Sequence, residues 1–301
     1  MAPQMDEDNE AMSGRGALLP GHRFPAAAVL EAVLRRRGLW DERIEAELLS
    51  GYRYWELERR VCCAMARHDL AAAWRQRRQH DQGTQEQSHQ QQQQQQQPQQ
   101  AEEERKRQGA PCKPGTLKDP GKQATCSPAP ALATAAPVPL DPGFTWPDAL
   151  AAHEAKSFDY RLLHLLLHRL AGTEYDEALL AFMAADERLV DIGDDLTDYE
   201  DDVIANSFNV YRALLHLHGP DTAALLLAER ISALEAERAR LLTRLPQRQR
   251  ELVVARQEAA VEGQGSDKWV FPRPVLAEGA FRERERTHEL EQRHRLGSGP
   301  V

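Results

Sequence analysis

The sequence predicts an all-α protein, and three observations lead to that prediction. Apolar residues recur at the i, i+3, i+4 spacing of one helix face, and nowhere do they alternate as in a half-buried strand. Glycine, proline and aspartate stand at positions where such helices begin or end. Of the 301 residues only 41% are hydrophobic and 6% aromatic, which indicates that a large part of the chain lies outside any core.

An abrupt change of composition near residue 79 divides the chain. Residues 79–142 are rich in glutamine, with an unbroken polyglutamine run at 90–97, and then in proline, alanine and threonine. Such a segment cannot bury enough apolar surface to offset its ordering entropy, so we expect a long disordered linker. The expected segments are a disordered N-terminus at 1–20, a helical segment at 21–78, the linker at 79–142, a helical domain at 143–286 and a charged tail at 287–301.

Two helices are expected before the linker. Pro25 suits a first helical turn, apolar residues follow it at helical spacing, and Gly38 ends the run. A second helix, from about 41 to 70, carries an apolar stripe that includes Tyr52 and Trp55. Helices of this size enclose only a marginal core, so we expect this segment to pack on the C-terminal half.

Several helices are expected after the linker. The first contains six leucines between residues 162 and 170, an apolar circumference that predicts central burial. Ser157 is its expected cap and Gly172 its end. The next helix begins near Thr173 and leads into an acidic segment. The remaining expected helices cover 208–218 and then the residues from the N-cap Asp221 to about 245, with a solvated helical hairpin over 229–250.

The acidic segment, residues 191–202, is the strongest indication of chemistry in the sequence. Its twelve residues hold seven acidic side chains and no basic one. At 100° per residue five aspartates fall on one helical arc, although like charges at i, i+4 spacing destabilise a helix. Carboxylates spaced in this way suit Mg²⁺, which takes one or two carboxylates, several waters and the oxygens of a phosphorylated ligand. The candidate metal ligands are Asp191, Asp194, Asp195, Asp198 and Asp202.

The segment from Asp194 to Asp198 has the form D-D-x-x-D and resembles the aspartate-rich motifs of the isoprenoid synthase superfamily, in particular the second such motif of the trans-prenyltransferases. The spacing of Asp194, Asp198 and Asp202 is similar to the other metal motif of the terpene synthases. The resemblance implies a helical bundle of the isoprenoid synthase fold. It also implies Mg²⁺ bridging a prenyl diphosphate, and ionisation or hydrolysis of that diphosphate. The second metal motif of the family is not recognisable in this sequence.

Three basic residues are candidates for binding the diphosphate. Lys268 and Arg273 lie in a proline-containing stretch that either packs across the helices or closes over the site as a lid, and Arg161 lies near the start of the leucine-rich helix. Cations at these positions would stabilise a leaving diphosphate.

The acidic segment has other interpretations. It can belong to a degenerate, non-catalytic relative of the isoprenoid synthases, or to an unrelated acidic helix. The alternative function is a non-catalytic helical interaction module whose acidic face binds a basic protein partner.

Charge and cysteine content limit the partners and the compartment. Acidic residues outnumber basic ones by 47 to 38, which disfavours a nucleic-acid partner. No apolar run approaches the roughly 20 residues of a membrane-spanning helix. The four cysteines fit neither a disulfide framework nor a zinc knuckle, and no targeting signal is recognisable. We therefore expect a cytoplasmic protein with reduced thiols, with the nucleus as the alternative location.

Overall fold

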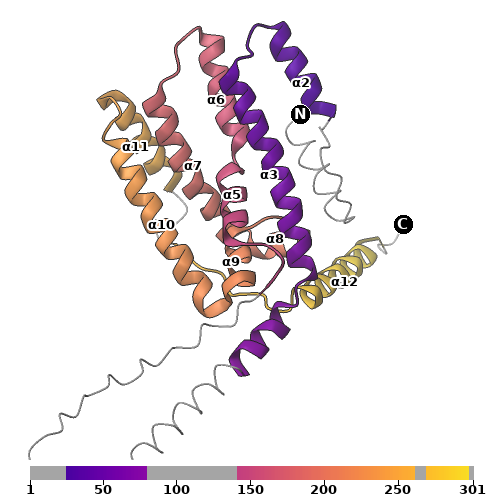
Figure 1. The fold of residues 1–301 in the computed structure, drawn as a ribbon. Coiled ribbons are helices and arrows are strands. Elements are labelled where there is room, and N and C mark those ends of the chain that lie inside the picture. Colours follow the sequence, from indigo (N-terminus) through magenta and orange to yellow (C-terminus); the bar gives the residue numbers. More distant parts are fainter. Residues whose placement is uncertain (1–24, 80–140, 262–268, 298–301) are drawn as a thin grey trace, which may run out of the picture. The chain divides into compact units, whose positions relative to one another are not determined.

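The computed structural model describes residues 25–79, 141–261 and 269–297 (Figure 1). All regular secondary structure within these residues is helical. The all-α prediction is therefore confirmed for this part of the chain.

The chain divides into two compact units. One consists of Met1–Ala71 together with Pro139–Val301, and the other of Ala72–Val138. Every helix named below belongs to the first unit. The N-terminus predicted at 1–20 and nearly all of the predicted linker, with its polyglutamine run, lie outside the described residues.

The two helices expected before the linker are confirmed as α2 (Pro25–Arg36) and α3 (Glu42–Arg67). Gly38 follows α2 with a φ of 67°, in the left-handed region that glycine adopts without steric cost. Asp41 is the N-cap of α3, and its carboxylate accepts two backbone N–H groups of the first turn.

Helices α5 (Trp146–Ala155) and α6 (Phe158–Ala171) follow the linker. Thr145 caps α5, and Gly172 ends α6 in the left-handed conformation, as predicted. Ser157 stands at the predicted cap position of α6, but its side chain makes no capping hydrogen bond. This hydroxyl has a different partner, described below.

The remaining helices agree only in part with the sequence-based expectations, since the break within the acidic segment and a helix over 278–297 were not expected. They are α7 (Glu177–Thr197), α8 (Tyr199–Ala205), α9 (Val210–His218), α10 (Pro220–Leu242), α11 (Gln247–Val261) and α12 (Glu278–Gly297). The start of α7 predicted near Thr173 is too early, because Asp176 caps the helix by accepting the N–H of Leu179. Helix α10 begins at Pro220 rather than after a cap at Asp221, because proline fits a first helical turn.

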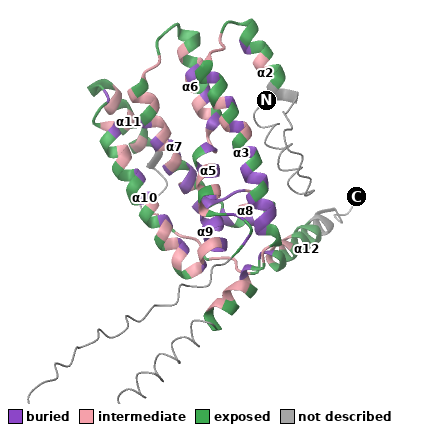
Figure 2. Ribbon diagram, viewed as in Figure 1, coloured by how far each residue is buried: buried purple, intermediate pink, exposed green. Residues whose placement is uncertain are grey.

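The core forms where α3 packs against α5 and α6 and where α10 packs against α7 and α9, and Figure 2 shows buried residues along these helices. Trp55 of α3 meets the ring of Phe158 edge-on, with ring centroids 5.1 Å apart. Gly51 lies against the same ring, which a β-carbon at this position would overlap. The two helices thus approach closely at a glycine, and the expected packing of the N-terminal segment on the C-terminal half is confirmed.

The central burial predicted for the leucine-rich helix α6 is wrong. Leu162 and Leu165 are buried in a cluster with residues of α2 and α3. Leu163, Leu167 and Leu170 are instead 50%, 51% and 68% exposed. The reason is that α3, its main packing partner, covers only one face of the helix. Among the described helices, none is long and apolar enough to cross a membrane.

Candidate functional site

The five candidate metal ligands lie on two different faces. Asp191 and Asp195 are buried, Asp194 and Asp198 are exposed, and Asp202 is half-buried. The single arc predicted for them is wrong for two reasons. The acidic segment is not one helix, since α7 ends before Asp198 and α8 begins after it. Neighbouring aspartates on α7 also point about 100° apart, so that Asp195 is buried while Asp194 is exposed.

The buried carboxylates face Lys156, in the turn between α5 and α6. Its ammonium lies 2.5 Å from Oδ1 of Asp195, while Oδ2 of Asp195 accepts the backbone N–H of Val210 at 2.6 Å. Burial alone would lower the pKa of Lys156, but the attraction of Asp195 and Asp191 outweighs it and raises that pKa. A permanent cation of the chain itself therefore neutralises this end of the acidic segment.

Ser157 explains how Asp191 is held. Its hydroxyl lies 2.8 and 2.9 Å from the two carboxylate oxygens of Asp191, which is why it does not cap α6. Burial raises the pKa of Asp191 to about 6, although Lys156 and this hydroxyl oppose the shift. Asp191 is thus an interior carboxylate that takes up a proton in mild acid.

Asp202 of α8 is held by the loop that precedes α9. The side-chain amide of Asn209 donates to its Oδ2 at 2.8 Å, and the hydroxyl of Ser207 donates to Oδ1 at 2.6 Å. Burial raises the pKa of Asp202, and these two hydrogen bonds oppose that shift. Asp202 therefore helps to fix the loop between α8 and α9.

Glu187 is a buried acid that the sequence analysis missed. It lies one helical turn before Asp191, so Glu187, Asp191 and Asp195 form a row along the buried face of α7, hereafter the acid row. Both carboxylate oxygens of Glu187 are buried without a hydrogen bond, and the nearest cation is Arg161 at 3.5 Å. Burial, only partly opposed by Arg161, raises the pKa of Glu187 to about 8. The i, i+4, i+8 spacing was visible in the sequence, but nothing there showed which way the row faces.

Neither Arg161 nor Arg273, the two candidate diphosphate-binding residues that the structure describes, forms an ion pair with an aspartate of the acidic segment. Arg161 donates to Glu47 of α3 at 3.0 Å and also faces Glu187, so both of its charge partners are already in the protein. Arg273 is exposed, and Lys268 lies outside the described residues.

The stretch from 269 to 277 packs across the helices, in agreement with the first of its two interpretations. The indole N–H of Trp269 donates to Glu235 of α10 at 3.0 Å. Phe271 lies edge-on against Tyr211, with centroids 5.7 Å apart, and the N–H of Val275 donates to the Tyr199 hydroxyl at 2.9 Å.

A polar cavity of about 320 Å³ lies beside Lys156. Carboxylates reach it from several helices: Glu58 from α3, Asp159 from α6, Asp191 from α7 and Asp202 from α8. Carboxylates on facing helices are therefore present, although they do not form a second D-D-x-x-D motif.

The side chains as they stand do not fit a magnesium ion at the D-D-x-x-D motif. Within the described ranges, no group of three or more histidine, cysteine, aspartate or glutamate side chains is placed to hold a metal ion. Asp195 is occupied by Lys156 and by a backbone N–H, which leaves Asp194 and Asp198 as two exposed carboxylates. The ammonium supplies part of the positive charge that an ion would bring.

Four carboxylates are exposed where α7 meets α8, and we call them the acidic corner. They are Asp194, Asp198, Glu200 and Asp201. None of the four has an ion-pair partner among the residues that the structure describes. Glu200 and Asp201 occupy the first turn of α8, where the helix dipole favours negative charge. Asp194 and Asp198 lie at i, i+4 spacing and repel each other.

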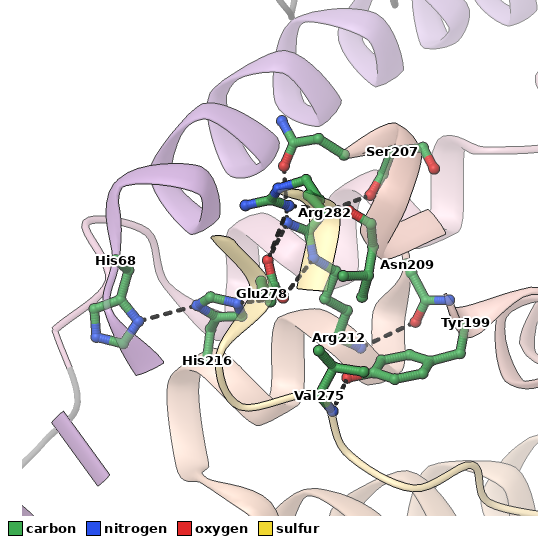
Figure 3. Close-up of polar contacts among 11 residues, drawn as sticks. His68, Tyr199, Ser207, Asn209, Arg212, His216, Val275, Glu278 and Arg282 are labelled. Atoms are coloured by element: carbon green, nitrogen blue, oxygen red, sulfur yellow. Dashed lines mark hydrogen bonds and ion pairs between the residues drawn. The ribbon is translucent and has the colours of Figure 1, made fainter. Parts of the chain in front are cut away.

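A second buried polar network surrounds Glu278 at the start of α12 (Figure 3). Its carboxylate accepts Nε and Nη2 of Arg212 at 2.8 and 2.6 Å, Nε2 of His216 at 2.9 Å and Nη1 of Arg282 at 3.2 Å. Burial alone would raise the pKa of Glu278, but the hydrogen bonds from Arg212 and His216 lower it to about 2. With His68, which contacts His216, these residues form the Glu278 cluster. This cluster could not be predicted from the sequence, because residues 62 and 66 positions apart carry no local signal of contact.

Comparison with family models, curated proteins and solved structures gave no match. The resemblance to the isoprenoid synthases therefore rests on the residues of the acidic segment alone. Its implications for fold, Mg²⁺ and prenyl diphosphate stay predictions.

Proposed function

We propose that this protein is a non-catalytic helical interaction module whose acidic corner binds a basic segment of a partner protein. The observation that carries the proposal is the contact between Lys156 and the buried Asp195. A metal-dependent enzyme would need this carboxylate free for its ion, whereas here a side chain of the protein already holds it. The interior aspartates then stabilise the fold, and the exposed ones remain available to a partner.

The acidic corner supports the choice of a basic partner. None of its four carboxylates forms an ion pair within the described part of the chain, and Asp194 and Asp198 repel each other. Lysine and arginine side chains of a partner would relieve that repulsion. Exposed charges of this kind act mainly on the association rate and on specificity, and salt weakens them.

Fluorescence anisotropy with a labelled lysine- and arginine-rich peptide tests the proposal. We expect the affinity to fall about tenfold or more when the acidic corner is neutralised, which corresponds to about 1.4 kcal/mol. The corner variant combines Asp194→Asn, Asp198→Asn, Glu200→Gln and Asp201→Asn. The control variant removes the same charge from exposed residues elsewhere and combines Glu229→Gln, Glu251→Gln, Glu258→Gln and Glu291→Gln. An equal loss in both variants would show that only net charge matters and would overturn the proposal.

The cavity beside Lys156 favours one other function, the binding of a prenyl diphosphate with Mg²⁺. Its carboxylates come from facing helices, and Lys156 could contact phosphate oxygens. Thermal unfolding with Mg²⁺ and farnesyl diphosphate, alone and together, distinguishes the two functions. A rise in Tm that needs both additives and is lost in Asp195→Asn would replace the interaction module by this second function. An unchanged Tm agrees with the interaction module.

A further inference from the structure

The Glu278 cluster determines where the hydrogens of His216 lie. Glu278 is ionised, so its oxygens can only accept hydrogen bonds. Nε2 of His216 lies 2.9 Å from Oε1 of Glu278 and must therefore carry a hydrogen. Because burial lowers the pKa of His216, this imidazole is neutral at pH 7 and its other nitrogen, Nδ1, has a free lone pair.

That lone pair faces a second histidine. Nδ1 of His216 lies 3.0 Å from Nδ1 of His68 (Figure 3), so His68 must be the donor in this contact. A first added proton binds Nε2 of His68 and leaves the contact intact. A second proton would place one N–H group against another, and two positive rings would face each other. The contact therefore tolerates one added proton but not two.

The charged groups around the two histidines oppose the binding of a second proton. The groups that face the two rings are Asp69, Asp141, Glu278, Arg212 and Arg282. The two guanidinium groups lie on the His216 side and Asp69 and Asp141 on the His68 side. The first proton is thus favoured on His68, and a second one on His216 is repelled by both guanidiniums and by the charged His68.

The contact joins the end of α3 to α9. His68 follows the last residue of α3, and its backbone N–H bonds to the carbonyls of Ala64 and Met65. The end of α3 and the start of α12 line a cavity of about 340 Å³, to which His68, Arg67 and Arg282 contribute. Solvent protons can therefore reach His68 at this position, whereas His216 is fully buried.

We propose that the His68–His216 contact is an acid-operated latch that fastens the end of α3 to α9. At neutral pH the two histidines hold at most one added proton, and the latch is closed. At lower pH the second proton separates the rings, frees the last turn of α3 and widens the adjoining cavity. Helix α12 stays on α9, because a charged His216 strengthens its ion pair with Glu278. The latch is independent of the proposed interaction with a basic partner.

Hydrogen exchange followed by mass spectrometry at pH 7.5 and at pH 5.0 tests the latch, with labelling times scaled for intrinsic exchange. We expect protection of the peptide that covers residues 64–71 to fall tenfold or more at pH 5.0. Peptides of α10 should keep their protection. Unchanged protection at residues 64–71, or simultaneous loss in α10, would overturn the proposal.

Substitution of His68 gives the matched variant. In His68→Gln the side-chain amide can donate to His216 when that ring is neutral and accept from it when the ring is charged. This variant should therefore stay closed at pH 5.0, whereas His288→Gln, which removes an exposed histidine of α12, should open like the wild type. Opening of His68→Gln at the same pH as the wild type would contradict the latch.

Discussion

The acid row of α7 and the Glu278 cluster are two buried ionic networks of opposite composition. In the acid row three carboxylates share two cations, Lys156 and Arg161. In the Glu278 cluster one carboxylate receives hydrogen bonds from two guanidiniums and an imidazole. The difference appears in the pKa values: burial raises that of Glu187 to about 8, whereas the surrounding donors hold that of Glu278 at about 2.

The two networks should therefore respond differently to the loss of a partner. The acid row can compensate for a missing cation by taking up protons, because Glu187 and Asp191 do so near neutral pH. Glu278 cannot compensate in this way, since its pKa of about 2 keeps it ionised near neutral pH. The acid row should therefore tolerate the loss of a cation and respond to pH, whereas the ion pairs of Glu278 should not tolerate such a loss and should respond to pH only near its pKa of about 2.

Loss of Arg212 should have the largest effect. The substitution Arg212→Met leaves Glu278 buried without its two shortest hydrogen bonds and should lower the free energy of unfolding by about 3–5 kcal/mol. Urea unfolding followed by circular dichroism measures it. Arg282→Met is the control, since Arg282 makes one longer bond to Glu278 and should cost less. Equal costs for both variants would contradict the central place of Arg212.

Loss of Lys156 should have a smaller effect that depends on pH. We expect Lys156→Met to lower the free energy of unfolding by about 3 kcal/mol at pH 8, because Asp195 stays buried without its cation. At pH 5.5 the cost should shrink, because Asp191, with a pKa of about 6, is then largely protonated and repels Asp195 less. The same urea experiment at both pH values measures this. A cost that is the same at both would remove the distinction between the two networks.

Glu187 should make stability fall as pH rises. Its folded pKa of about 8 lies above its ordinary value of 4.5, so between these values the folded state holds a proton that the unfolded state has lost. Relative to Glu187→Gln, the wild type should lose up to about 1.4 kcal/mol per pH unit in this window. For Glu278 the sign is reversed, because its folded pKa lies below 4.5 and its stabilisation is lost as pH falls toward 2. A difference between wild type and Glu187→Gln that stays constant from pH 5 to 8 would show that Glu187 is not protonated in the fold.

The exposed aspartates should give the smallest effect. Asp198→Asn should change the free energy of unfolding by less than about 0.5 kcal/mol, because the side chain is exposed and makes no capping hydrogen bond at its position between α7 and α8. Asp195→Asn should cost clearly more, since it removes the buried partner of Lys156. Similar costs at the two positions would mean that the acidic segment does not have the two faces described here.

Much of the helix pattern could be predicted from the sequence because its signals are local. Gly38 and Gly172 end helices where only glycine fits easily, and proline begins them at Pro25. The exposed leucines of α6 could not be predicted, since six leucines in nine residues fit central burial and half burial alike. Which face is covered depends on α3, more than a hundred residues earlier in the chain.

For the same reason, the spacing of the acidic segment could be read from the sequence, but the partners of its carboxylates could not. The D-D-x-x-D spacing is local, but the choice between metal binding and internal ion pairing depends on what lies opposite. Here that is Lys156, 39 residues before Asp195, and the backbone of Val210, 15 residues after it. Neither residue carries a sequence signal that points to the motif.

The most direct test asks whether Lys156 keeps a metal ion from binding at the D-D-x-x-D motif. It measures the binding of Mn²⁺, used in place of Mg²⁺, by electron paramagnetic resonance. The measurement compares the wild type with Asp195→Asn, each with and without inorganic diphosphate. We predict that the wild type retains no more Mn²⁺ than Asp195→Asn under either condition, because the ammonium of Lys156 already holds Asp195. Stoichiometric Mn²⁺ binding by the wild type that Asp195→Asn abolishes would contradict that account.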